Sequence, residues 1–290
     1  MKGKVVLITG ASSGIGKASA MGLARMGASL VLICRNEEKG EAARGEIVKA
    51  TGNFSIELLL ADLLKQKEVR RVAAEFKTNH PRLDVLINNA GASFVGYAET
   101  EDGIERTMAI NYFTPFLLTN LLLDTLKGGI SSRVVNVTSS EHNAGNLDLD
   151  NIGRDRRMGR VGAEAYRRSK LAVVLFTYEL ARRLQGTGVT ATCVNPGAVR
   201  TNIWSNVGAY TLLFRLFSVF MQSPEKGAEG SIFLASSPEV GGVTGKYFDK
   251  KVPRRSSEAT YDELLAKKLW DISLNMTGFG VRNESVSPSE

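Results

Sequence analysis

The chain contains few of the residue types on which disulfide-bonded or metal-binding proteins depend. Its 290 residues include two cysteines, Cys34 and Cys193, and two histidines, His80 and His142. Both cysteines fall in predicted core strands, so we expect buried free thiols in a reducing compartment rather than a disulfide framework. The histidines are isolated and show no metal-ligand spacing, so no metal site is predicted.

Long hydrophobic runs are also absent, because no apolar segment reaches the ~18 residues that a helix needs to cross a bilayer. The composition, 43% hydrophobic and 23% charged, is that of an ordinary globular protein. The first strand is predicted almost at Met1, which leaves no room for a signal peptide. We therefore expect a cytoplasmic protein.

Positive charge is in excess, with a net charge of +7. The basic residues gather in two clusters, which are Arg154, Arg156, Arg157, Arg160, Arg167 and Arg168, and Lys250, Lys251, Arg254 and Arg255. Solvated surface is the simplest interpretation. Attraction of an anionic cofactor, or peripheral contact with an anionic membrane, are the alternatives. No nucleic-acid partner is expected, because no recognition motif accompanies the charge.

Strand-like and helix-like segments alternate along the chain. The predicted strands are 4–9, 29–34, 56–61, 85–88, 133–138, 189–195 and 245–248, and the predicted helices are 15–26, 37–50, 65–78, 101–126, 163–185, 224–236 and 258–271. Buried strands that alternate with amphipathic helices predict a doubly wound α/β fold, in which helices cover both faces of a parallel sheet. No repeat or linker divides the chain, so we expect a single domain over residues 1–275 and a C-terminal tail over 276–290.

A glycine-rich turn follows the first predicted strand and leads into a helix. Its glycines are Gly10, Gly14 and Gly16. Such a turn lets backbone N–H groups approach a pyrophosphate at the positive end of a helix. A P-loop is disfavoured, since Ala11 stands where its first glycine belongs and Ala18 where Ser or Thr would hold magnesium. A tight turn without a ligand is the alternative, but the segment predicts dinucleotide binding.

The end of the second strand indicates which dinucleotide is bound. An acidic residue at this place holds the ribose 2′-hydroxyl in NAD sites, but here the position is occupied by Cys34. Arg35 follows, and its guanidinium matches a 2′-phosphate through charge-assisted hydrogen bonds. Lys17 could add a second positive charge. We therefore predict NADP(H), with a surface role for Arg35 as the alternative.

Tyr166 and Lys170 lie four residues apart in a predicted helix, so their side chains share one face. A free tyrosine has a pKa of ~10 and is a poor base at neutral pH, but a nearby ammonium group lowers that pKa. The pair predicts a proton-transfer site, unless the two are unrelated surface residues. Ser139 ends a strand, where its hydroxyl could bind a substrate oxygen or make a turn. Asn111 is a poor helix former in a predicted helix, which suggests a polar role.

These motifs occur in the order typical of one family. The sequence resembles the short-chain dehydrogenase/reductase family in Thr9-Gly10-x-x-x-Gly14-x-Gly16, Asn88-Asn89-Ala90-Gly91, Asn111, Ser139, Tyr166-x-x-x-Lys170 and Pro196-Gly197. The resemblance covers most of the chain. It implies a seven-stranded Rossmann domain and an oxidoreductase.

The resemblance also implies roles for individual residues. Tyr166 would be the general acid/base, Lys170 would lower its pKa and bind the nicotinamide ribose, Ser139 would orient the substrate carbonyl, and Asn111 would hold a water in a proton relay. The implied cofactor-binding residues are Gly10, Ser12, Ser13, Gly14, Ile15, Gly16, Arg35, Asp62, Leu63, Asn88, Ala90, Gly91, Tyr166, Lys170, Pro196, Gly197, Val199 and Thr201. Among them, Asn88 and Gly91 would line the adenosine side, Asp62 would lie near the adenine, and Thr201 would contact the carboxamide.

A closer resemblance is to the retinol dehydrogenase branch of this family. It is carried by the segments 34–40, 169–172 and 179–184, by Phe176, by Gly245-Lys246-Tyr247-Phe248, and by the long interval between Ser139 and Tyr166. The branch implies NADP(H) and a lipophilic aldehyde or alcohol such as retinal or retinol. A steroid, quinone or porphyrin-like substrate, and a dinucleotide-binding protein without catalysis, stay as alternatives.

A substrate lid is expected over residues 200–224, where the segment 210–221 is strongly apolar. Such a segment could cover a lipophilic pocket or contact a membrane face, and an ordinary core helix is the alternative. The family also implies a homodimer as one assembly, which the sequence does not decide.

Overall fold

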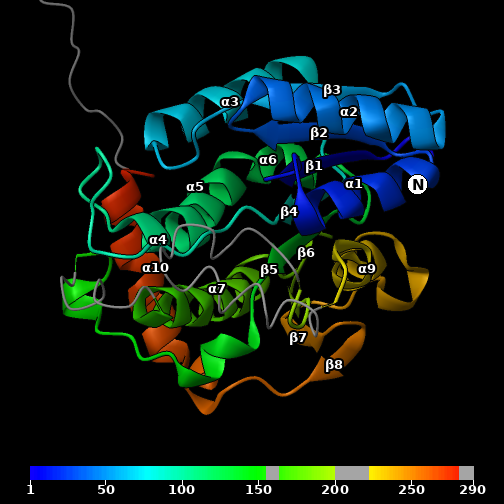
Figure 1. Cartoon of the computed structure of the whole chain (residues 1–290). Helices are drawn as coiled ribbons and strands as arrows, with labels where there is room; N and C mark the ends of the chain where they lie inside the picture. The colour runs from blue at the N-terminus through cyan, green and yellow to red at the C-terminus, as the bar shows by residue number, and fades with distance from the viewer. Residues whose placement is uncertain (155–162, 200–221, 281–290) are drawn as a thin grey trace, which may run out of the picture.

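An eight-stranded sheet forms the centre of the molecule (Figure 1). The computed structural model describes residues 1–154, 163–199 and 222–280. The strands are β1 (Val5–Thr9), β2 (Ser29–Cys34), β3 (Ile56–Leu60), β4 (Val85–Asn88), β5 (Arg133–Val137), β6 (Thr190–Asn195), β7 (Lys246–Asp249) and β8 (Val252–Arg254). Their order in the sheet is β3-β2-β1-β4-β5-β6-β7-β8, with β1 to β7 parallel. The strand order therefore reverses between β1 and β4.

The predicted seven strands are all present, but the prediction of a seven-stranded sheet was wrong by one strand. β8 pairs antiparallel with β7 after a turn in which Lys250 has a φ of 57°. All three residues of β8 are exposed, and one of them is Pro253. A short exposed strand has no hydrophobic pattern, so the sequence gives no signal for it.

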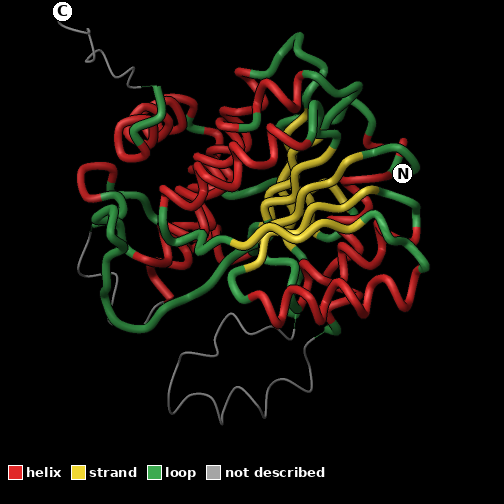
Figure 2. Tube along the Cα trace, turned by 90° about the horizontal axis from the view of Figure 1, so that it is seen from above, coloured by secondary structure: helices red, strands yellow, loops and turns green. Residues whose placement is uncertain are grey.

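Helices cover both faces of the sheet (Figure 2). The α-helices are α1 (Gly14–Arg25), α2 (Glu37–Thr51), α3 (Gln66–Asn79), α4 (Arg106–Met108), α5 (Thr114–Leu121), α6 (Leu123–Lys127), α7 (Ala163–Arg183), α9 (Pro224–Ser236) and α10 (Glu263–Thr277). Shorter helices are the π-helix η1 (Ala109–Phe113) and the 3-10 helices η2 (Ser140–Ala144), η3 (Leu149–Asn151), η7 (Pro238–Val240) and η8 (Glu258–Tyr261). Within the described ranges, no helix has the combined length and apolar character that crossing a membrane requires.

Alternate residues of each central strand enter two different cores. Leu7 belongs to the core that contains buried residues of α3, α5, α7 and α10, whereas its neighbours Val6 and Ile8 belong to the core that contains those of α1, α2 and α9. All three side chains are fully buried. Strands buried on both faces explain why the sequence runs are apolar throughout rather than alternating. Both cysteines are buried and free, as predicted.

The helix predicted over 101–126 is broken into several pieces. Glu105 caps α4 by accepting hydrogen bonds from the backbone N–H groups of Thr107 and Met108. A π-helical turn follows at η1, and Asn111 lies within it. Pro115 lacks an N–H group, so it cannot make the α-helical bond to the carbonyl of Asn111. The wider turn is the result, and such turns often occur at functional sites.

The last predicted helix, over 258–271, is also divided. The 3-10 helix η8 ends at Tyr261, and Asp262 then caps α10 by accepting a hydrogen bond from the N–H of Leu265 at 2.9 Å. α10 continues to Thr277, beyond the predicted domain end at residue 275, and stops at Gly278 in the left-handed conformation. The division into a domain and a tail remains a prediction.

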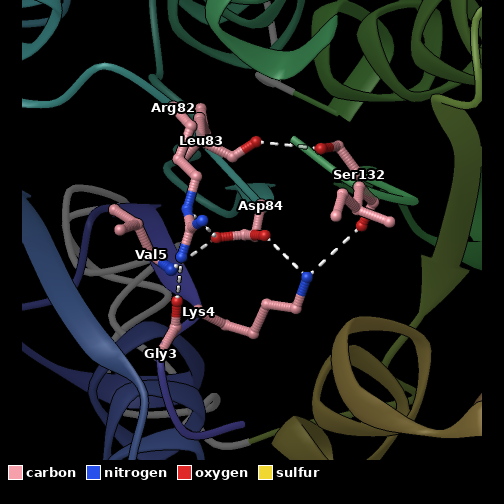
Figure 3. Close-up of polar contacts among 8 residues, drawn as sticks. Gly3, Lys4, Val5, Arg82, Leu83, Asp84 and Ser132 are labelled. Carbon is pink, nitrogen blue, oxygen red and sulfur yellow. Dashed lines mark hydrogen bonds and ion pairs between the residues drawn. The ribbon is translucent and has the colours of Figure 1, made fainter. Parts of the chain in front are cut away.

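A polar cluster fixes the amino-terminal ends of the central strands (Figure 3). The carboxylate of Asp84 accepts hydrogen bonds from the N–H of Val5 at 2.9 Å and from Lys4 Nζ at 2.7 Å. The Ser132 hydroxyl donates to the carbonyl of Leu83 at 3.0 Å. These contacts hold β1, β4 and β5 in register. The carboxyl ends of these three strands, at the other end of the sheet, are thereby placed side by side.

Candidate active site

A cleft of about 750 Å³ lies at the carboxyl ends of the strands, where the strand order reverses. Most predicted site residues line it, and they are Gly10, Ser12, Ser13, Gly14, Ile15, Gly16, Arg35, Asp62, Leu63, Ala90, Gly91, Ser139, Tyr166, Lys170, Pro196, Gly197 and Val199. Thr201 and nearly all of the predicted lid lie outside the described residues. The loops that build the cleft follow β1 to β6, as expected for a doubly wound sheet.

Two positions of the turn after β1, Gly10 and Gly16, have no room for a Cβ atom. A Cβ atom on Gly16 would come within 2.3 Å of the carbonyl oxygen of Gly10. One on Gly10 would come within 2.9 Å of the backbone of Ala90, and Gly10 and Gly14 both have positive φ. No acidic residue stands in the first turn of α1, and Ser13 makes no side-chain cap there. The N–H groups at this helix start therefore face the cleft ready to receive an anion.

The loop after β4 is fastened to this turn by Thr9 and Asn89. The Thr9 hydroxyl accepts hydrogen bonds from the N–H groups of Asn89 at 3.0 Å and Ala90 at 2.9 Å. Asn89 Nδ2 donates to the carbonyls of Thr9 at 2.8 Å and Gly10 at 3.2 Å. The two walls of the cleft at the strand reversal are therefore held as one unit.

Asn88 has a different place from the one predicted. Its side chain is 3% exposed and does not line the described cleft. Its Nδ2 donates to Thr119 Oγ1 at 3.0 Å and to Asn136 Oδ1 at 2.8 Å, between α5 and β5. Asn88 thus joins sheet and helix, and the neighbouring Asn89 lies at the cleft.

Asn111 lies behind the cleft wall and fixes two of its elements. Its Oδ1 accepts from the N–H of Ala92 at 2.9 Å, and its Nδ2 donates to the carbonyl of Ala92 and to Ser169 Oγ, both at 2.9 Å. Asn111 is 2% exposed. It therefore connects the loop after β4 with α7, the helix that carries Tyr166. Its predicted role with a water molecule stays a prediction.

Tyr166 and Ser139 meet at the end of the cleft formed by β5 and α7. The Ser139 hydroxyl is hydrogen-bonded to the phenol of Tyr166. Burial raises the pKa of that phenol to about 12, and the bond from Ser139 offsets only part of the rise. Tyr166 is therefore a neutral phenol at physiological pH. Burial dominates this shift, and the predicted effect of Lys170 on the phenol stays a prediction.

Lys170 is a buried cation with spare donors. Its Nζ lies 5.4 Å from the centre of the Tyr166 ring and donates to the carbonyl of Val137 at 3.0 Å. This carbonyl is its only hydrogen-bond acceptor in the described part of the chain. Burial lowers the pKa of the Lys170 ammonium to about 8. A buried ammonium group with unused donors that lines a cleft is suited to hydroxyl groups of a bound ligand.

His142 supports the backbone of Ser139 from behind. Its Nδ1 lies 2.7 Å from the carbonyl oxygen of Ser139, and its Nε2 accepts a hydrogen bond from the N–H of Ser257 at 3.2 Å. The ring also packs on Tyr247, with 4.8 Å between ring centres, and it is 1% exposed. These contacts require a neutral imidazole with its proton on Nδ1. The sequence predicts no role for His142. Its position three residues after Ser139 was the signal that could have indicated one.

The neutral state of His142 makes stability pH-dependent. Burial lowers the pKa of this imidazole below its ordinary value. The unfolded chain therefore binds more protons as pH falls below about 6.5, and the free energy of unfolding should decrease by at most about 1.4 kcal/mol per pH unit from this group. We expect urea unfolding between about pH 7.5 and 5.5 to show this loss in the wild type and a smaller one in His142→Gln. His80→Gln is the control, and equal slopes in wild type and His142→Gln would contradict the assignment.

The end of β2 carries a cation and no acid. Arg35 is exposed, lines the cleft and forms no ion pair within the described part of the chain. Burial raises the pKa of the preceding Cys34 thiol, which therefore stays uncharged. Lys17 does not line the described cleft, because its Nζ pairs with Glu46 Oε2 at 2.7 Å. Of the two predicted positive charges, Arg35 alone is at the cleft.

Further lining residues were not predicted, among them Asn89, Phe94, Glu141 and Arg167. Asn89, Glu141 and Arg167 stand within two positions of a predicted site residue, which was the signal that could have found them. Phe94 lies under the guanidinium of Arg106, 4.0 Å from its ring centre, and had no such signal.

The sequence comparisons agree on one family. Residues 4–211 match the family model described as short chain dehydrogenase. The chain is similar to "Retinol dehydrogenase 13" of Homo sapiens, with 42% identity over 282 residues that span 95% of this chain and 85% of that protein.

Solved structures have the same architecture. An uncharacterized protein from Mycobacterium Paratuberculosis has a TM-score of 0.77 and 33% identity, over 96% of this chain and 94% of that chain. A short chain dehydrogenase from Escherichia coli CFT073, complexed with NADPH, has a TM-score of 0.68 and 27% identity, over 87% of this chain and 98% of that chain.

Proposed function

This chain belongs to the short chain dehydrogenase family, in its retinol dehydrogenase branch, and on that premise we propose that it transfers hydride between NADP(H) and an uncharged, lipophilic aldehyde or alcohol. It is an oxidoreductase, and its family uses nicotinamide cofactors. The observation that carries the proposal is the meeting of Ser139, Tyr166 and Lys170 on one wall of the cleft. The glycine turn and Arg35 line the same cleft.

The residues present fit a phosphorylated dinucleotide. The open N–H groups at the start of α1 suit its pyrophosphate. The spare donors of Lys170 suit ribose hydroxyls, and Arg35 suits the 2′-phosphate that distinguishes NADP from NAD. An NAD site would favour an acidic group where the uncharged thiol of Cys34 stands.

The proposed chemistry divides between cofactor and protein. When bound, the nicotinamide supplies or accepts the hydride. The hydroxyl of Ser139 and the phenol of Tyr166 both donate hydrogen bonds to the carbonyl oxygen of the substrate. As that oxygen gains negative charge, the neutral phenol gives it a proton. The nearby ammonium of Lys170 stabilises the phenolate that remains.

A lipophilic substrate is supported by the wall beside the catalytic residues. Ala92, Phe94, Ile110 and Val137 line the cleft there. Apolar walls favour an apolar substrate because its surface is removed from water on binding. The retinol dehydrogenase named among the relatives fits this class, and a retinal-like aldehyde is the substrate we propose first.

A substrate panel tests the proposal. The purified protein is mixed with NADPH and retinal, a steroid ketone, a quinone or an aliphatic aldehyde, and oxidation is followed by loss of NADPH fluorescence. We expect turnover to be highest with the lipophilic aldehydes and at least tenfold lower when NADH replaces NADPH, which corresponds to about 1.4 kcal/mol. Cofactor binding without oxidation by any member of the panel would instead indicate a non-catalytic dinucleotide-binding protein.

A further inference from the structure

An ion pair borders the catalytic end of the cleft. Glu141 lies in η2 and Arg167 in α7, and both line the cleft next to Ser139 and Tyr166. Arg167 Nε donates to Glu141 Oε2 at 2.8 Å. The two side chains are 39% and 44% exposed, for Arg167 and Glu141 respectively. The pair therefore joins the Ser139 segment to the Tyr166 helix at a place that solvent and substrate both reach.

The negative member of the pair acts on the catalytic phenol. After the dominant effect of burial, the carboxylate of Glu141 also raises the pKa of Tyr166. Its charge is therefore felt where the substrate carbonyl would bind. Arg167 is already neutralised by Glu141 and offers little attraction to a second anion.

The remaining described carboxylate of the cleft is too far away to share this role. Asp62 follows β3, and β2, β1 and β4 separate β3 from β5 in the sheet. At about 4.8 Å per strand, these ends lie roughly 19 Å apart. Glu141 is thus the one carboxylate at the catalytic end among the described lining residues.

We infer that Glu141 is a specificity-determining residue, which excludes carboxylate-bearing carbonyl compounds and leaves uncharged ones as substrates. The inference rests on the proposed function and narrows its substrate class. A substrate carboxylate would meet the charge of Glu141 beside an Arg167 that is already paired, while the proposed function assigns the Lys170 ammonium to the ribose hydroxyls of the cofactor. An uncharged aldehyde of the same shape meets no such repulsion. A purely structural surface ion pair would instead contribute at most about 1 kcal/mol to stability and nothing to selectivity.

Two aldehydes of nearly equal shape test this inference. Methyl 4-formylbenzoate is uncharged, and 4-carboxybenzaldehyde is an anion at pH 7.5. The readout is the ratio of kcat/KM for the acid to kcat/KM for the ester, with NADPH. We expect the wild type to prefer the ester. Glu141→Gln frees Arg167 and should raise the ratio about tenfold, which is the effect of one unit charge at several ångströms in a partly solvated site.

The chain offers a matched control for this substitution. Glu164 pairs with Arg168 at 2.8 Å on the same helix, and neither residue lines the described cleft. Glu164→Gln makes the same change in net charge and should leave the ratio within twofold of the wild type. Arg167→Gln leaves Glu141 uncompensated and should lower the ratio. If Glu141→Gln fails to fold, the ratio measured for Arg167→Gln tests the inference instead.

The outcomes separate this inference from the proposed function. Reduction of the ester by the wild type supports the function, whatever the ratio is. An equal ratio in Glu141→Gln and Glu164→Gln, or a wild type that prefers the acid, would overturn the inference alone. A wild type that reduces neither aldehyde nor any member of the substrate panel would overturn both.

Discussion

Tyr166→Phe is expected to lower kcat for carbonyl reduction by roughly 10²- to 10⁴-fold, the usual contribution of a positioned general acid. The substitution removes the hydroxyl that we propose gives a proton to the substrate oxygen. The ring stays in place, so NADPH affinity should change by less than about threefold, which is less than 1 kcal/mol. Stopped-flow turnover and fluorescence titration with NADPH measure the two quantities.

A second tyrosine on α7 provides the control. Tyr178 is as buried as Tyr166, at 7% exposure, and its hydroxyl lies 2.7 Å from Ser256 Oγ, away from the described cleft. Tyr178→Phe makes the same chemical change and should cost stability but keep kcat. If Tyr166→Phe retained kcat within tenfold of the wild type, the proton donor would have to be another group.

Arg35→Asp is expected to weaken NADPH binding by about 100-fold, or about 2.7 kcal/mol, and to change NADH binding little. A hydrogen bond to a charged group contributes about 1.5–3 kcal/mol, and the new carboxylate repels a 2′-phosphate in addition. The dissociation constants of both cofactors are measured by titration. The readout is the loss of NADPH affinity divided by the loss of NADH affinity.

Arg44→Asp is the control for the change of charge. Arg44 lies on α2, pairs with Glu41 at 2.7 Å and does not line the described cleft. Arg44→Asp should weaken the binding of NADPH and of NADH equally and only slightly. Equal losses of NADPH and NADH in Arg35→Asp would mean that Arg35 does not bind the phosphate.

The sequence predicted the parts of this molecule that are set by local patterns. The apolar runs became the strands because burial on both faces leaves no polar alternation. Tyr166 and Lys170 share a helix face because four residues make about one turn. The glycine turn could be predicted because its backbone excludes a Cβ atom, as the contacts of Gly10 and Gly16 with their neighbours confirm.

Features that depend on tertiary packing could not be predicted in this way. The last residue of β4, Asn88, turns its side chain between sheet and helix, and only the next residue, Asn89, lies at the cleft. Sequence alone does not say on which side of such a boundary a side chain falls. The pKa of Tyr166 was expected to fall because a cation is near. Burial raises it instead, and the burial of this side chain depends on the whole fold.

The roles of His142 and Glu141 arise from long-range contacts. His142 reaches Ser257, which is far along the chain, and Glu141 pairs with Arg167 on another element. Neither contact has a periodic signal in the sequence. The break of the predicted helix at η1 did have a signal in the sequence. Pro115 follows Asn111 by four positions and lacks the N–H group that would bond to the carbonyl of Asn111 in an α-helix.

Transfer of deuterium tests the central claim most directly. NADPH that carries deuterium at the transferring position of C4 is incubated with a lipophilic aldehyde such as retinal and the wild-type protein, and the alcohol is analysed by mass spectrometry. One deuterium on the carbinol carbon, lost together with turnover in Tyr166→Phe, is the predicted result. Alcohol without label, or no alcohol from any aldehyde despite bound NADPH, would contradict the account.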